Sequence, residues 1–97
     1  MTDKKELGST IDTGRQAEAL LNQPLFIAAV KTLRLVAIEK FENLGFTDTL
    51  GMQECNIRLN LVEELESNLN TIIANGDIAF RTLEEIQTFE QEIANGR

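Results

Sequence analysis

The feature that most constrains the fold is a long amphipathic stretch from Thr47 to Gly76. Its apolar residues recur at steps of three and four, which is the period of a helix buried on one side. At 1.5 Å per residue such a helix is about 40 Å long. A chain of 97 residues cannot wrap a compact core around it. Part of its apolar face therefore needs another helix of similar length, or another subunit.

Boundary signals flank this stretch. Residues 47–49 form a capping sequence in which Asp48 or a neighbouring threonine accepts the free N–H groups of the first turn, and Phe46 can act as a hydrophobic staple. The sequence Asn-Gly at residues 75–76 predicts the end of the helix, because glycine adopts the left-handed conformation without a Cβ penalty. Ile-Ala-Asn-Gly recurs at residues 93–96, which we interpret as a second helix C-cap, not as a repeated domain.

A second helix is predicted from Pro24 to about Asn43, since proline suits the first helical turn. Its apolar stripe contains Phe26, Val30, Leu33, Ala37, Phe41 and Leu44. The connection over residues 43–47 is short, so the two long helices should be antiparallel. We therefore expect an all-α fold built on an antiparallel helical hairpin.

Shorter elements flank the predicted hairpin. Residues 14–22 have a helix-forming composition, and Thr82-Leu83-Glu84-Glu85 fits a capping box before a last helix. Asp77 to Arg81 either begins that helix or forms a connecting turn. Residues 1–13 carry only isolated apolar residues, which predicts a disordered N-terminal arm. The expected organisation is this arm followed by a single helical domain over residues 14–97.

Charge and composition exclude several classes of protein. The net charge of −7 lies entirely in residues 48–97, which contain ten acidic residues and three arginines. Phosphate neutralisation dominates nucleic-acid affinity, so direct binding of nucleic acid or of an acidic membrane surface is not expected. No stretch reaches the roughly 18 apolar residues of a membrane span, and the first ten residues are polar. A cytoplasmic location is expected, and the lone cysteine agrees with a reducing compartment.

The sequence offers little catalytic chemistry. It has no histidine, which removes Ser-His and Cys-His nucleophiles and the usual zinc ligand. Cys55 lies on an apolar stripe, where a free cysteine commonly packs as a small hydrophobe. Glu63, Glu64 and Glu66 lack the loop geometry of a calcium site and are better explained as a solvated helix face. We expect the chain to have no catalytic residue, cofactor or metal, and not to be an enzyme.

Two apolar stripes on the long helix imply two neighbours. One stripe should close the hairpin and contains Met52, Cys55, Leu59, Val62, Leu69 and Ile73, with Glu66 as a polar exception. The other is left for a partner, together with residues that widen the apolar side of the second helix. This candidate interface consists of Ile27, Leu35, Ile38, Leu61, Leu65 and Ile72. It predicts a homodimeric helical bundle, unless the short flanking helices cover both stripes.

Three segments carry a resemblance to a known group of proteins. They are residues 17–26 (Ala-Glu-Ala-Leu-Leu-Asn-Gln-Pro-Leu-Phe), residues 47–49 (Thr-Asp-Thr) and residues 72–79 (Ile-Ile-Ala-Asn-Gly-Asp-Ile-Ala). Their arrangement resembles small helical accessory proteins of tailed bacteriophages, over about residues 17–83. The resemblance implies a structural or interaction protein of the host cytoplasm or the virion, linked to virion assembly or DNA packaging, and it transfers no catalytic residue.

A second function remains open at this stage. The carboxylate excess of residues 48–97 is also typical of an acidic inhibitor that mimics nucleic acid and occupies the basic groove of a host enzyme. Such binding would depend strongly on salt concentration. The identity of any protein partner is not contained in the residues.

Overall fold

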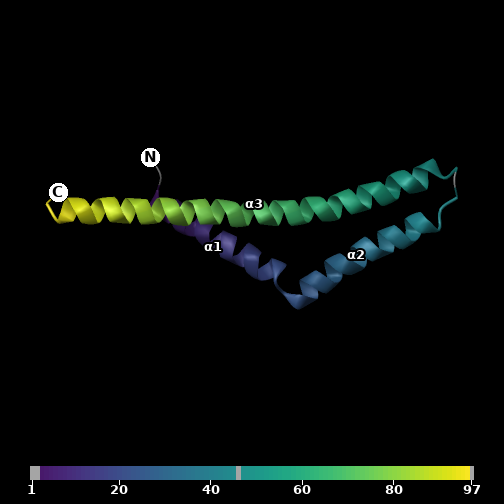
Figure 1. Cartoon of the computed structure of the whole chain (residues 1–97), viewed down its shortest axis with the longest axis horizontal. Coiled ribbons are helices and arrows are strands. Elements are labelled where there is room, and N and C mark those ends of the chain that lie inside the picture. Colours follow the sequence, from purple (N-terminus) through teal and green to yellow (C-terminus); the bar gives the residue numbers. More distant parts are fainter. Residues whose placement is uncertain (1–2, 46, 97) are drawn as a thin grey trace. The chain divides into compact units, whose positions relative to one another are not determined.

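The residues that the structure describes form three α-helices. A computed structural model of the chain describes residues 3–45 and 47–96, and these form α1 (Lys4–Leu21), α2 (Pro24–Glu42) and α3 (Thr49–Ala94) (Figure 1). No strand occurs among these residues, so the all-α prediction is confirmed. Contacts within the chain group into two units, unit 1 (residues 1–19 and 69–97) and unit 2 (residues 20–68). α3 contributes one part to each unit.

α3 does not end where the sequence predicted. It continues through Asn75-Gly76 for 46 residues in all, so the predicted C-cap at this position is wrong. The predicted capping box is also wrong, because Thr82 lies inside the helix and its Oγ1 donates to the Ile78 carbonyl oxygen at 2.9 Å. Asp77 to Arg81 is helical. The second Asn-Gly behaves as expected, since Gly96 follows the end of α3 with a φ of 78°.

α1 begins at Lys4, where the sequence predicted a disordered arm up to residue 13. Within unit 1, Leu7 and Ile11 are buried together with Ala79, and Leu83 and Ile86 pack against them. If α3 ended at residue 76, as the sequence predicted, residues 4–13 would have no apolar surface to pack against. Burial against α3 supplies the apolar contacts that offset the entropy of ordering α1. Met1 and Thr2 lie outside the described residues.

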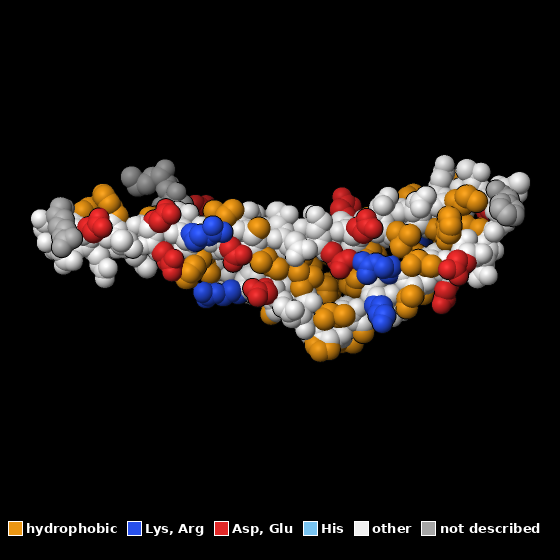
Figure 2. Space-filling view, viewed as in Figure 1, with side chains coloured by type: hydrophobic (Ala, Val, Ile, Leu, Met, Phe, Trp, Pro, Cys, Tyr) orange, Lys and Arg blue, Asp and Glu red, His pale blue; other side chains and the backbone are white. Residues whose placement is uncertain are grey.

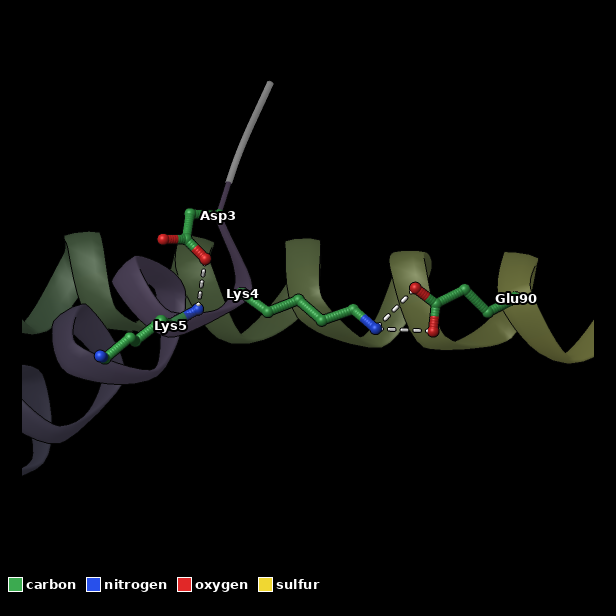
Figure 3. Close-up of polar contacts among 4 residues, drawn as sticks. All are labelled: Asp3, Lys4, Lys5 and Glu90. Carbon is green, nitrogen blue, oxygen red and sulfur yellow. Dashed lines mark hydrogen bonds and ion pairs between the residues drawn. The ribbon is translucent and has the colours of Figure 1, made fainter.

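Polar contacts fix the N-terminal end of α1. Asp3 caps the helix, since its Oδ1 accepts the Lys5 N–H at 3.0 Å and its carbonyl oxygen accepts the Leu7 N–H. Lys4 Nζ lies 2.6 and 2.7 Å from the two carboxylate oxygens of Glu90 on α3 (Figure 3). Both side chains are about half exposed, so this pair contributes little stability. It marks where the first turn of α1 lies along α3.

A pair of glycines brings α1 and α3 into close contact. A Cβ atom on Gly14 would lie 3.0 Å from the Gly76 Cα and 3.3 Å from the Ile72 carbonyl oxygen, and one on Gly76 would meet the α1 backbone in the same way. Gly76 therefore allows α1 and α3 to approach closely and does not end a helix. Lys4 contacts Glu90, and Gly14 contacts Gly76. Later residues of α1 thus meet earlier residues of α3, so α1 is antiparallel to this part of α3.

In unit 2, α2 begins at the predicted residue and ends within one residue of the predicted end, and α3 begins where the sequence predicted. Pro24 occupies the first turn of α2, and at its end the Asn43 N–H donates to the Glu39 carbonyl oxygen while the Leu44 N–H donates to the Phe41 carbonyl oxygen. Asp48 is the N-cap of α3, since its Oδ1 accepts the Gly51 N–H at 2.8 Å. The predicted staple residue, Phe46, lies outside the described residues. The apolar contact between the helices contains Val30, Ala37, Cys55 and Val62, all of them buried.

Glu66 explains the polar exception in the apolar stripe of α3. Its carboxylate forms an ion pair with the Arg34 guanidinium on α2, and both side chains are partly exposed. The acid therefore lies at the margin of the α2–α3 contact, where a partner and solvent satisfy it.

No single helix in residues 3–45 and 47–96 is long and apolar enough to cross a membrane. α1 and α2 meet the same criterion of length and composition when they are taken together across their break.

The glycine contact predicts opposite results for two glycines of α1. Gly8 has open space at its Cβ position, so Gly8→Ala should raise the free energy of unfolding by about 0.5–1 kcal/mol through helix propensity. Gly14→Ala gains the same propensity but crowds the α3 backbone, and should be less stable than Gly8→Ala by at least about 1 kcal/mol. Urea denaturation followed by circular dichroism measures both. Equal stabilisation by the two changes would contradict the close contact.

Candidate interaction surface

Most of the buried apolar side chains are smaller than leucine. Among the described residues the buried hydrophobic positions are Leu7, Ile11, Ala17, Val30, Ala37, Cys55, Val62 and Ala79. Within the same described ranges, sixteen large hydrophobic side chains are exposed. Single exposed leucines are normal on protein surfaces, whereas contiguous groups of them mark contact sites. The arrangement of these side chains on each helix decides which case applies.

The α2 residues of the predicted interface lie together. Ile27, Leu35 and Ile38 are exposed and line one groove of about 450 Å³ in unit 2. Its floor and rim also include Phe26 and Val30 of α2, and Lys31, Arg34 and Glu66 are its charged residues. In Figure 2, hydrophobic side chains on the α2 segment alternate with basic and acidic ones over the visible face. We call this feature the α2 groove.

The α3 residues of the predicted interface do not line the α2 groove. Val62 is buried in the α2–α3 contact, and Leu61 lies one residue earlier, about 100° further round the helix. Glu54, seven residues before Leu61, shares its side of α3 and lines a different groove together with Val36 and Lys40 of α2. The geometry therefore places Leu61 and the α2 groove on opposite sides of the α2–α3 contact.

The six predicted interface residues are thus distributed over three places. Ile27, Leu35 and Ile38 line the α2 groove. Leu61 and Leu65 are exposed on the other side of unit 2. Ile72 belongs to unit 1 and is partly buried.

Sequence reasoning missed two residues that extend the exposed side of α3. Leu50 and Ile57 are 78% and 59% exposed and precede Leu61 and Leu65 at helical spacing. The four residues follow steps of seven, four and four, a helical spacing that is present in the sequence. Leu50 adjoins the capping segment of α3. We call Leu50, Ile57, Leu61 and Leu65 the aliphatic stripe of α3.

The groups with potential chemistry lie apart. No cluster of three or more Cys, Asp or Glu side chains that could hold a metal ion occurs in the part of the chain that the structure describes. Cys55 is 3% exposed and lies in the α2–α3 contact, as its position on the apolar stripe predicted. Glu63 and Glu64 are exposed on α3. Among the described residues, the exposed apolar side chains are therefore the main candidates for a binding surface.

Comparisons with known proteins return no relative. The sequence matches no model of a known protein family, and it has no significant match among curated proteins or solved structures. The resemblance to bacteriophage accessory proteins therefore stays a prediction.

The burial of Cys55 predicts a protected thiol. In the folded protein it should react with an aromatic disulfide reagent at least about tenfold more slowly than in denaturant, since an enclosed thiol is inert. The matched control is Gln53→Cys in a Cys55→Ser background, because residue 53 is exposed on the same helix. Absorbance of the released thiolate measures both rates. Equal rates in the folded proteins would show that Cys55 is accessible.

Proposed function

We propose that the chain is a non-catalytic interaction protein that self-associates through the hairpin of α2 and the first part of α3, with a dimeric helical bundle as its working form. One observation carries this proposal: the large aliphatic side chains of unit 2 lie outside its own contact. The residues buried between α2 and α3 are Val30, Ala37, Cys55 and Val62, whereas the α2 groove and the aliphatic stripe remain open.

The energetics favour covering these surfaces. Full burial of a leucine or isoleucine side chain stabilises by about 1.5–3 kcal/mol, and a 97-residue chain with alanine, valine and cysteine in much of its core gains little of this internally. Small domains with limited cores commonly reach adequate stability by oligomerisation. Association would bury the exposed aliphatic residues and add to the stability of the fold.

A role as an accessory protein of a tailed bacteriophage, in virion assembly or DNA packaging, is the biological setting that we propose. Its support is the resemblance carried by residues 17–26, 47–49 and 72–79. Assembly proteins act by binding other proteins and need no catalytic site, which agrees with a surface whose main feature is apolar.

Ion pairs within the chain count against mimicry of nucleic acid for part of the acidic charge. Glu54, Glu66 and Glu90 each form an ion pair with a basic residue of the same chain. These pairs neutralise part of the acidic charge. A mimic of the phosphate backbone would instead present its carboxylates unpaired to a basic groove.

Self-association is tested by the mass of the protein in solution. Light scattering coupled to size-exclusion chromatography should give twice the mass of the 10.9 kDa chain at micromolar concentrations. The dimer should persist in high salt, because apolar burial is not screened by ions. A monomer at these concentrations would contradict the proposal.

The biological setting is tested by affinity capture from lysates of infected and uninfected cells at low and high salt. The proposal expects a capsid or packaging protein, specific to the infected lysate and retained at high salt. Capture of a nucleic-acid enzyme that is lost at high salt would favour the acidic mimic, because electrostatic binding weakens with ionic strength.

A further inference from the structure

We infer that the aliphatic stripe of α3, and not the α2 groove, is the surface through which two copies of the chain meet. This inference rests on the proposed self-association and names its contact surface. The partner is a second copy that presents the same stripe, which gives a contact related by a two-fold axis.

The first support is the geometry of the stripe. At 100° per residue, Leu50, Ile57, Leu61 and Leu65 fall within about 80° of the circumference of α3. All four are exposed and belong to unit 2. Two residues of α2 lie on the same side. Val36 lines a groove together with Glu54, and Leu33 shares a helix face with Lys40, which lines that groove as well.

The second support is the area available. The stripe residues are between 42% and 78% exposed, and Leu33 and Val36 are also exposed. Since a fully exposed Leu or Ile presents on the order of 180 Å², the six residues offer roughly 600 Å² per chain. Two such surfaces bury about 1,200 Å², which reaches the range of specific protein–protein contacts. A patch of this size is also at the upper end for a typical monomer.

The third support is charge, which permits a second copy at this face. Each copy carries a net charge of −7, so two copies repel one another unless they meet through a face of low charge. Glu54 is the charged residue within the stripe, and its carboxylate is paired with Arg58 at 2.7 Å. Glu64 lies at the margin of the stripe on α3, and Glu39 and Lys40 of α2 line the groove that Glu54 also lines. Apolar side chains and largely compensated charges therefore let a like-charged copy approach through the stripe.

Two matched substitutions test this assignment. Leu61→Glu and Ile27→Glu each place one negative charge at an exposed apolar residue of unit 2, 58% and 50% exposed, on opposite sides of the α2–α3 contact. Analytical ultracentrifugation over a range of concentrations gives the dimer dissociation constant of each. Leu61→Glu should raise this constant by at least about tenfold, because it buries a charge in the contact. Ile27→Glu should change it by less than about twofold.

Circular dichroism is the check that both variants keep their helices, and Leu61→Lys separates loss of apolar contact from added negative charge. If Leu61→Lys weakens the dimer as Leu61→Glu does, the stripe itself is the contact. Dissociation by Ile27→Glu alone, or equally by both glutamate variants, would overturn the assignment to the stripe while self-association stands. A monomeric wild-type protein would overturn the self-association on which the inference depends.

Discussion

The structure depends on one continuous helix that both other helices contact. α3 packs against α1 within unit 1 and against α2 within unit 2. A series of α3 residues at intervals of seven, namely Cys55, Val62, Leu69, Gly76 and Leu83, is buried or partly buried. Three of these five residues are smaller than leucine, and small residues let helix backbones approach closely, as the contact between Gly14 and Gly76 demonstrates. Several leucines and isoleucines of α3 lie outside this series and are exposed.

Local signals predicted the structure where they act alone. Pro24 and Asp48 mark helix starts through backbone chemistry that needs no distant partner, and both occupy the predicted positions. Asn-Gly at residues 75–76 carries a local signal as well, but here a tertiary contact overrides it. A glycine inside a helix costs about 1 kcal/mol relative to alanine, and close packing against Gly14 offsets that cost. The Asn-Gly signal would end α3 at residue 76 if the contact with α1 were absent.

The interaction surface was only partly predictable for a related reason. Helical periodicity identifies which residues of one helix share a face, and it correctly grouped Leu61 with Leu65 and separated them from Val62. It does not say which side of one helix adjoins which side of another. That depends on how α2 and α3 are paired, and the pairing places Ile27, Leu35 and Ile38 on the side opposite Leu61. Periodicity alone therefore predicts one apolar surface shared by α2 and α3, whereas unit 2 has two separate ones, the α2 groove and the aliphatic stripe.

The ion pair between Arg34 and Glu66 shows how this pairing is specified. Both side chains are partly exposed, so the pair adds at most about 1 kcal/mol to stability. Its position says more about the rotation of α2 than about its register. Sliding α2 by one turn in one direction would bring Ala37 toward the Glu66 carboxylate, whereas a slide in the other direction would bring Lys31, which lines the same groove as Arg34 and Glu66. Rotating α2 about its own axis would instead separate Arg34 from its acid. The pair therefore favours the rotation in which Ile27, Leu35 and Ile38 line the α2 groove and Val36 lies on the other side, toward the aliphatic stripe.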